Sequence, residues 1–450
     1  MQFKVKHYQL LLLAVALGSS PVFAVDLVGV HDLAARNDPQ LKAAAFRRDA
    51  TGENKRQAWS NLLPTLSGSA SATKGDNEVG IDGIKVSESD IDTENYSLNL
   101  RQSLYAQSNY EQLDVARGQI SQAQAIYDIA YQNFLVRVAG GYFGVLTAKD
   151  GVIFAEAEEK ALQRQFEQAE QRFEVGLTAV TDVHEARASY DNARARAIVS
   201  RNNLADANEA LFELTRQYFN AVDPLQEVLP LVKPLPENQS EWVGLAMQYN
   251  PAVIAAQKSL EIADATVRLQ RSGHFPTLDL VASTGRFTNN EFLIRDDFQQ
   301  PIGNVPLTSD DNRISLQLSV PLYQGGLVSS RTRQARYTLN AVNEDLEQQQ
   351  RAVIRQTNNA YRAVIAGIEQ VGAFGQALIS AKSALEATQA GFEVGTRTIV
   401  DVLIAQQRYY RALQDNSAAR HTYIVDHLRL KAAAGVLAEE DLQKINSILK

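Results

Sequence analysis

The chain has 450 residues, a formal net charge of −8 and no cysteine. The negative charge disfavours nucleic acid as a partner, and without thiols we expect neither disulfides nor a lipid anchor on an N-terminal cysteine. Stability is therefore expected to come from packing and assembly.

Residues 1–24 have the pattern of a secretory signal peptide. Lys4 and Lys6 precede an apolar run from Leu10 to Leu17, and small residues ending at Ala24 suit cleavage there. A buried N-terminal helix is the alternative. Cleavage would leave a mature charge of −10, because this segment contains two lysines and no acid. No later stretch approaches the roughly 20 consecutive apolar residues of a membrane-spanning helix, so a membrane crossing would have to use the strands of a closed barrel.

The rest of the chain is an internal duplication. The segment from Asp38 aligns with the one from Asn250 at an offset of 212, and "SLNLRQSLY" from residue 97 aligns with "SLQLSVPLY" from 315. The phrase "FEVGLTAVTDVHEA" (173–186) returns as "FEVGTRTIVDVLIA" (392–405), at an offset of 219. Small changes in offset are typical of loop insertions between matching elements. We therefore expect a first structural repeat over 25–245 and a second over 246–450.

Each repeat contains two segments that alternate at period two. Strands are expected at about 64–74, 96–106, 276–287 and 313–323. About ten residues is the length that crosses a membrane in a tilted barrel. The polar, Gly-rich segments between the strands of each pair are expected to be exposed outer loops. Aromatic residues at strand ends suit a membrane girdle, although they also serve simple packing; they are Tyr96, Tyr105, Phe275 and Tyr323.

Four strands cannot close a barrel. Two hairpins would leave open edges in lipid, and the unpaired backbone groups of such edges are not tolerated there. Three chains would supply twelve strands, so we expect a homotrimer.

The prolines indicate where long helices run. None lies between Pro64 and Pro224, and none follows Pro321, and proline breaks helix interiors. These regions are rich in good helix formers, and helices are expected at about 107–172, 182–218, 326–391 and 399–436. The longest would extend roughly 100 Å. Apolar residues spaced four and three apart indicate coiled-coil packing, with an ordinary amphipathic helix as the alternative; they are Ala116, Ile120, Ala123, Tyr127, Ala130 and Phe134.

The repeated phrase is predicted to be the tip of a helical hairpin. Gly176 and Gly395 can take the left-handed conformation that ends a helix. Thr398, with Asp401 three residues later, resembles a capping box that begins the next helix. An acid in a first turn also suits the helix dipole. For both Asp182 and Asp401, helix capping is thus the structural alternative to a role in a pore.

These features resemble the TolC-type outer-membrane factor (outer membrane efflux protein) family. The resemblance rests on the duplicated plan, on "LLPTLSGSAS" and "SLNLRQSLY", and above all on "VGTRTIVDVLIAQQRYY", and it covers essentially the whole mature chain. It implies a mostly α fold with membrane β: a trimeric twelve-stranded barrel in the outer membrane of a Gram-negative bacterium, continuous with a periplasmic α-helical barrel.

The same resemblance implies a function and partners. Such proteins are exit ducts of tripartite efflux pumps or type I secretion systems, which export small molecules or proteins through an iris-gated tunnel. The implied partners are two further copies of the chain, a periplasmic adaptor (membrane fusion) protein, an inner-membrane transporter and outer-membrane lipid. The sequence does not indicate the cargo, because specificity for the cargo would lie with the inner-membrane partner.

The resemblance also implies a gate at the two tips. Asp401 matches an aspartate that faces the pore. Phe392 and Arg397 match a tyrosine and an arginine that bond to the neighbouring tip, where their partners match Thr181 and Asp182. A charge-assisted pair of this kind can hold a gate and still be rearranged by a docking partner.

Two residues depart from the family pattern. Phe392 has no hydroxyl, so one restraining bond of the gate is missing. Ile404 stands where a second pore aspartate would be. We therefore expect one ring of three carboxylates rather than two, and weaker cation binding at the gate.

Other functions have less support in the sequence. No phosphate loop or nucleophile elbow is present, so we expect neither an enzyme nor a cofactor. No metal site is expected either, because the histidines show no ligand spacing; they are His7, His31, His184, His274, His421 and His427. Export of soft metal ions is disfavoured by the scarcity of Met and His. A periplasmic coiled-coil adaptor without a pore is the better rival, but it would not need four lipid-length strands.

Overall fold

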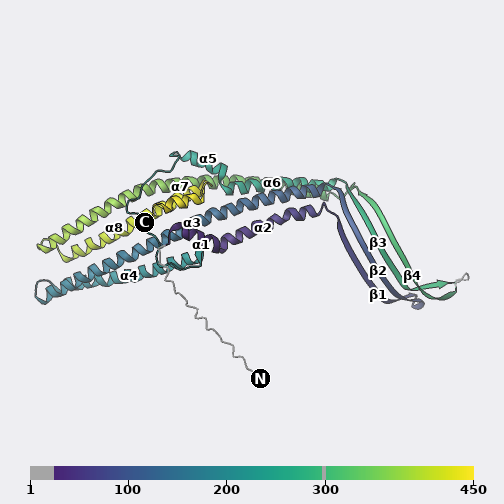
Figure 1. The fold of residues 1–450 in the computed structure, drawn as a ribbon, viewed down its shortest axis with the longest axis horizontal. Coiled ribbons are helices and arrows are strands. Elements are labelled where there is room, and N and C mark those ends of the chain that lie inside the picture. Colours follow the sequence, from purple (N-terminus) through teal and green to yellow (C-terminus); the bar gives the residue numbers. More distant parts are fainter. Residues whose placement is uncertain (1–24, 296–299) are drawn as a thin grey trace, which may run out of the picture.

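The computed structural model describes residues 25–295 and 300–450, so the predicted signal peptide lies outside the described residues. The molecule is elongated, with a sheet at one end, two helical hairpin tips at the other, and helix α1 and the C-terminus near the middle (Figure 1). The helices are α1 (Leu27–Asn37), α2 (Pro39–Ser60), α3 (Gln107–Glu174), α4 (Val180–Thr215), α5 (Gln239–Tyr249), α6 (Pro251–Arg271), α7 (Leu327–Glu393), α8 (Ile399–Ala433) and α9 (Glu439–Asn446). The predicted mostly α fold is confirmed, and the β part of one chain is a small antiparallel sheet.

The sheet contains four strands in the order β1-β2-β3-β4, and all neighbours are antiparallel. The strands are β1 (Thr65–Ile81), β2 (Ile84–Ala106), β3 (Thr277–Arg295) and β4 (Pro301–Ser319). They are longer than the alternation predicts, because backbone pairing continues beyond the point where apolar side chains alternate. Most of the two segments expected as outer loops is therefore strand. β4 ends sooner than expected, two residues before Pro321, which has no N–H for the ladder.

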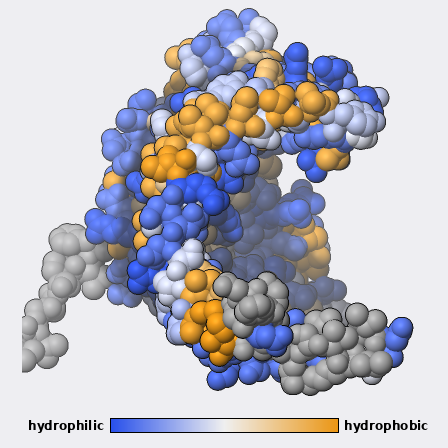
Figure 2. Space-filling model, turned by 90° about the vertical axis from the view of Figure 1, so that its right-hand side faces the viewer, coloured by the Kyte–Doolittle hydropathy of each residue, from blue (hydrophilic) through white to orange (hydrophobic). Residues whose placement is uncertain are grey.

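One face of the sheet is apolar. Leu280 lies opposite Leu316 in the register, and two residues away on the same face Leu278 lies opposite Leu318. Ile314 on this face is 79% exposed in the single chain. Viewed from the sheet end, the molecule curves around an open side, and apolar residues gather along its outer, convex surface (Figure 2). Such a face requires a cover of lipid or protein.

The opposite face of the sheet is polar. Asp279 and Gln317 pair there, one position from the apolar pairs. Arg101 donates a hydrogen bond from Nη2 to Oδ2 of Asp279 at 2.8 Å. The sheet thus has one apolar and one polar face, an alternation that is typical of strands in membrane barrels.

The main core lies at mid-length, where the chain ends meet the long helices. Its largest fully buried side chains come from α1, α3, α4, α8 and α9; they include Leu27, Phe134, Tyr142, Leu211, Leu428 and Leu442. The amide of Leu27 donates to Oδ1 of Asn446 at 3.0 Å. Asn446 in turn donates to Asp26 at 2.8 Å. The first and last helices are therefore joined directly.

In both repeats the second helix begins with a capping side chain followed by a proline. Asp38 caps α2 and Asn250 caps α6, and each is followed by a proline at the first helical position, where no N–H is needed. Asn250 also donates through Nδ2 to the carbonyl of Ala433 at 2.8 Å, which joins α6 to the end of α8. Gly435 follows α8 with φ +76°, and a Cβ added there would lie 2.4 Å from the carbonyl oxygen of Tyr249.

We therefore expect Gly435→Ala to be strongly destabilising. Both the left-handed backbone and the contact with Tyr249 oppose a side chain, and the strain alone costs about 1–3 kcal/mol. Gly52→Ala is the matched control, because that glycine lies in α2 with open space around it and alanine favours helices. Thermal unfolding followed by circular dichroism should show a lower midpoint for Gly435→Ala alone. Equal midpoints for both variants would contradict the expectation.

Candidate gate at the helical hairpin tips

The two hairpin tips end their first helices in the same way. Gly176 and Gly395 have φ of +74° and +80°. The amide of Gly176 donates to the carbonyl of Phe173 at 2.9 Å, and the next amide donates back to Arg172 at 2.8 Å. The same two bonds recur around Gly395 in the second tip. This is the Schellman motif, which satisfies carbonyls at a helix end and turns the chain sharply.

The tips begin their second helices differently. α8 has a full capping box: Thr398 Oγ1 accepts from the amide of Asp401 at 3.3 Å, and Oδ2 of Asp401 accepts from the amide of Thr398 at 3.0 Å. α4 has Ala179 at the cap position with no side-chain cap bond. There, Asp182 instead accepts a hydrogen bond from the hydroxyl of Thr178. Both aspartates therefore have local structural partners.

The capping bonds set the charge state of Asp401. The backbone hydrogen bond from Thr398 is the largest cause that lowers the pKa of this carboxyl group, the Thr398 hydroxyl bond adds to it, and the charge of Arg397 contributes further. The carboxylate is therefore held in its charged form at neutral pH. Three such groups around a symmetry axis would form a ring of fixed negative charge.

The two tips of one chain pack against each other. Ile399 and Leu403 of α8 are buried in one cluster with residues of the first hairpin, namely Leu162, Ala169, Ala186 and Ala193. On the same helix, Ile404 is 42% exposed in the single chain. Leu403 thus faces the first hairpin, while Ile404, about 100° further around α8, faces open space in the single chain.

Phe392 has a partner that the sequence does not indicate. The guanidinium carbon of Arg172, in the last turn of α3, lies 4.6 Å from the centroid of the Phe392 ring. This is a cation–π contact between the two hairpins of one chain. The residues are 220 positions apart, so no local spacing could have revealed the pair.

The structure does not join all the predicted gate residues within one chain. Among the described residues, Arg397 forms no ion pair, while Asp182 is bonded to Thr178. Thr181 is exposed beside it. A bond from Arg397 to Asp182 therefore requires a different chain or a different arrangement of the tips.

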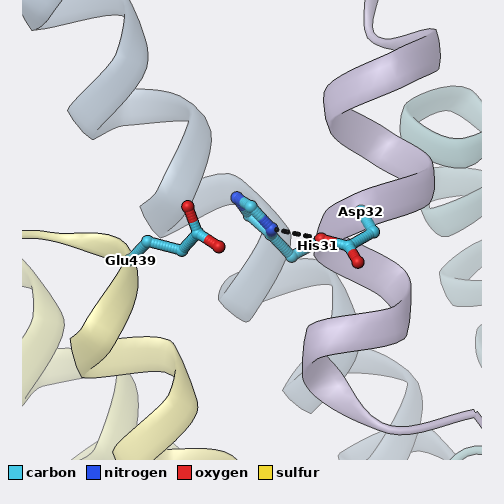
Figure 3. A group of neighbouring side chains, drawn as sticks. All are labelled: His31, Asp32 and Glu439. Atoms are coloured by element: carbon cyan, nitrogen blue, oxygen red, sulfur yellow. Dashed lines mark hydrogen bonds and ion pairs between the residues drawn. The ribbon is translucent and has the colours of Figure 1, made fainter.

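A second group of side chains was also not indicated by spacing. His31 and Asp32 of α1 lie beside Glu439 of α9, at the other end of the sequence (Figure 3). One imidazole nitrogen and one oxygen from each carboxylate lie within 4.8 Å of one another. Histidine spacing predicts no ligand set here, because Glu439 lies near the other end of the sequence from His31.

Comparison with known proteins places the chain in a family. A family model described as "Outer membrane efflux protein" matches residues 30–215 and 242–436. The chain belongs to the outer membrane efflux protein family. Outer membrane protein TolC of Vibrio cholerae is 38% identical over 98% of this chain and 98% of its own length. Alkaline protease secretion protein AprF of Pseudomonas aeruginosa is 28% identical over 94% of this chain and 87% of its own length.

Solved structures share the fold. The crystal structure of CusC matches with a TM-score of 0.75 and 19% identity, over 92% of this chain and 93% of that one. As a member of the outer membrane efflux protein family, this chain is an outer-membrane channel protein of Gram-negative bacteria with a large periplasmic part, and it is not an enzyme. The predicted family and location are confirmed.

The capping box predicts how the second tip responds to mutation. Thr398→Val removes the hydroxyl but keeps the shape, and losing an N-cap costs about 1 kcal/mol. Hydrogen exchange of the first turn of α8 should accelerate roughly fivefold, while the tip at Gly176 remains unchanged. Thr398→Ser retains the hydroxyl and is the control. If exchange were unchanged in Thr398→Val, the capping box would not stabilise this tip.

Proposed function

We propose that three copies of this chain form a twelve-stranded barrel that continues into a helical tunnel. The trimer serves as the outer-membrane exit duct of a tripartite efflux pump or a type I secretion system. The observation that carries the proposal is the four-stranded sheet, whose outer strands β1 and β4 each have one partner among the described residues and whose one face is apolar. Because β1 and β4 run antiparallel, β4 of one chain can pair with β1 of the next, all around a ring.

The helical part also leaves apolar residues unburied in the single chain. α7 contains an 18-residue stretch that is apolar enough to cross a membrane by length and composition, yet only 17% of it is buried in the single chain. This helix extends from the sheet end of the molecule to the second tip, beside α6 and α8 (Figure 1). Neighbouring copies around a tunnel would bury such a stretch, which supports assembly through the helices as well as the sheet.

The proposed partners act at the tips. Val175, Leu177 and Val394 beside the two tip glycines are 69%, 76% and 75% exposed. Exposed apolar residues at a projecting end are typical of a docking surface. We assign this end to the periplasmic adaptor, and through it to an inner-membrane transporter that selects the cargo. The names of the relatives TolC and AprF are consistent with an outer-membrane duct and with protein secretion, respectively.

The gate in this proposal consists of Asp401, Arg397, Asp182, Thr181, Phe392 and Ile404. Arg397 has no ion-pair partner among the described residues of its own chain, so its guanidinium is available to Thr181 and Asp182 of the adjacent chain. Asp401 supplies one ring of three carboxylates, and Ile404 places an apolar ring next to it. The contact of Arg172 with Phe392 holds the two tips of each chain together in place of the missing tyrosine hydroxyl.

The assembly is tested by the mass of the purified protein. In mild detergent we expect a species of three chains that dissociates to monomers on heating, measured by light scattering after size exclusion and by sedimentation. A folded monomer at the same protein concentrations would overturn the proposal.

Neighbouring residues of β4 provide a matched test of the barrel wall. Leu316 is on the apolar face and Gln317 on the polar face. Leu316→Lys should impair insertion into vesicles, since a lysine facing lipid costs about 2–4 kcal/mol at the bilayer midplane. Gln317→Lys should insert normally. Equal insertion of the two variants would mean that this face does not contact lipid.

The gate is tested by conductance. Arg397→Ser or Asp182→Ala leaves the remaining charge without its partner, so we expect single-channel conductance in planar bilayers to increase several-fold. Arg187→Ser is the control, because that arginine is near the first tip but interacts only weakly with Asp191 at 3.9 Å. Unchanged conductance in both gate variants would show that this pair does not hold the tunnel closed.

A further inference from the structure

The inference concerns the point where the two ends of the chain meet. α1 and α9 are held together by the bonds of Asn446 to Leu27 and Asp26. Glu439 is the first residue of α9. Two residues on, Asp441 caps the helix and accepts a hydrogen bond from Lys431 at 2.6 Å. The backbones that carry His31 and Glu439 are therefore fixed by contacts that do not involve these two side chains.

His31 is the buried member of the cluster. Its side chain is 6% exposed, and its ring packs at 54° against Phe134 of α3 with centroids 5.6 Å apart. Nδ1 lies 3.2 Å from Oδ1 of Asp32, and the ring lies between the carboxylates of Asp32 and Glu439 (Figure 3). Nε2 is buried and has no hydrogen-bond partner among the described residues. Within the described residues, the one hydrogen-bond partner of the ring is therefore Asp32, a member of the cluster.

The cluster holds two carboxylates and one imidazole, so its formal charge is negative. Asp32 is 56% exposed, and the imidazole is its one partner among the described residues. Within the described part of the chain, Glu439 forms no hydrogen bond or ion pair, although its charge reaches Tyr131. The nearest lysines along α8 and α9, Lys431 and Lys444, are both paired with Asp441.

We propose that His31, Asp32 and Glu439 bind a divalent transition-metal ion of the zinc class. One imidazole nitrogen and two carboxylate oxygens form a mixed donor set that suits such ions, whereas Ca²⁺ and Mg²⁺ prefer oxygen alone. Ligands about 2.1 Å from a tetrahedral zinc ion are about 3.4 Å from one another. The 3.2 Å between Nδ1 of His31 and Oδ1 of Asp32 is close to that value. Glu439 reaches the same point from an exposed, adjustable side chain, and water completes the coordination.

The site would act as a clamp. Metal coordination would join α9 to α1 beside the core residue Phe134, in addition to the bonds of Asn446. Because the donors come from opposite ends of the sequence, they come together only in the folded chain, so bound metal stabilises the folded state over the unfolded one. The clamp is far from the tips and is separate from transport of any cargo.

Zinc binding to the full-length protein tests the proposal. The protein is first treated with EDTA and transferred to chelator-free buffer at pH 8, where imidazole is neutral. It is then titrated with Zn²⁺, and binding is followed by calorimetry and by thermal unfolding. We expect one saturable site per chain and a higher unfolding midpoint with zinc. Glu439→Gln and His31→Gln should each weaken binding by at least about tenfold, in the range that follows the loss of site residues.

Matched controls make the outcome decisive. Glu440→Gln removes the adjacent exposed carboxylate of the same helix turn, and His274→Gln removes a histidine outside the cluster; both should retain wild-type affinity. Because Glu439 is exposed, its variant should fold even where replacing buried His31 disturbs the core.

Co²⁺ should give visible absorption bands that the Glu439 variant lacks. Absence of saturable binding, or binding that survives Glu439→Gln, would overturn the proposal. Stabilisation that depends on pH but not on zinc would instead identify a protonated histidine paired with two carboxylates.

Discussion

Every backbone N–H and C=O group inside a bilayer needs a hydrogen-bond partner, and in this chain that requirement falls on the free edges of β1 and β4. Only another strand can satisfy such an edge in lipid. The constraint extends beyond the sheet, because β2 ends at Ala106 and α3 begins at Gln107 with no residue between them. The position of β2 in a closed barrel would therefore fix where α3 begins. Closure of the sheet would in this way constrain the placement of that long helix.

The two hairpin tips share one kind of helix ending but differ in how the next helix begins. Both use the same glycine-based helix ending, but only α8 has a capping box, in which Asp401 is held ionised. In the first tip, Thr178 engages Asp182 instead. A cation–π contact at an exposed site contributes only about 0.5–1 kcal/mol, whereas a hydrogen bond to a charged group contributes about 1.5–3 kcal/mol. With Phe392 in place of a tyrosine, closure of the proposed gate depends mainly on Arg397.

Much of this arrangement could be predicted from sequence because it is local. The gaps between prolines indicate the long helices, and the glycines and the Thr398 to Asp401 spacing indicate the turn and the cap. The strands were predicted too short, because polar hairpins pair through the backbone without an apolar alternation. The contact of Arg172 with Phe392 could not be predicted, since it depends on how α3 and α7 pack. The same holds for His31 and Glu439, which only the folded chain brings together.

The distribution of side chains along the molecule suggests where it can change shape. At mid-length the core contains large interlocking groups such as Phe134 and Tyr142, and the chain ends are joined there through Asn446. Near the tips the first hairpin and α8 share a smaller cluster, whose buried members are Leu162, Ala169, Ala186, Ala193, Ile399 and Leu403. Displacing a large buried side chain leaves a costly cavity, and fewer such side chains are buried near the tips than at mid-length. A rearrangement of the tips can therefore leave the middle of the molecule intact, so a docking partner at the tips has only the weaker contacts to overcome.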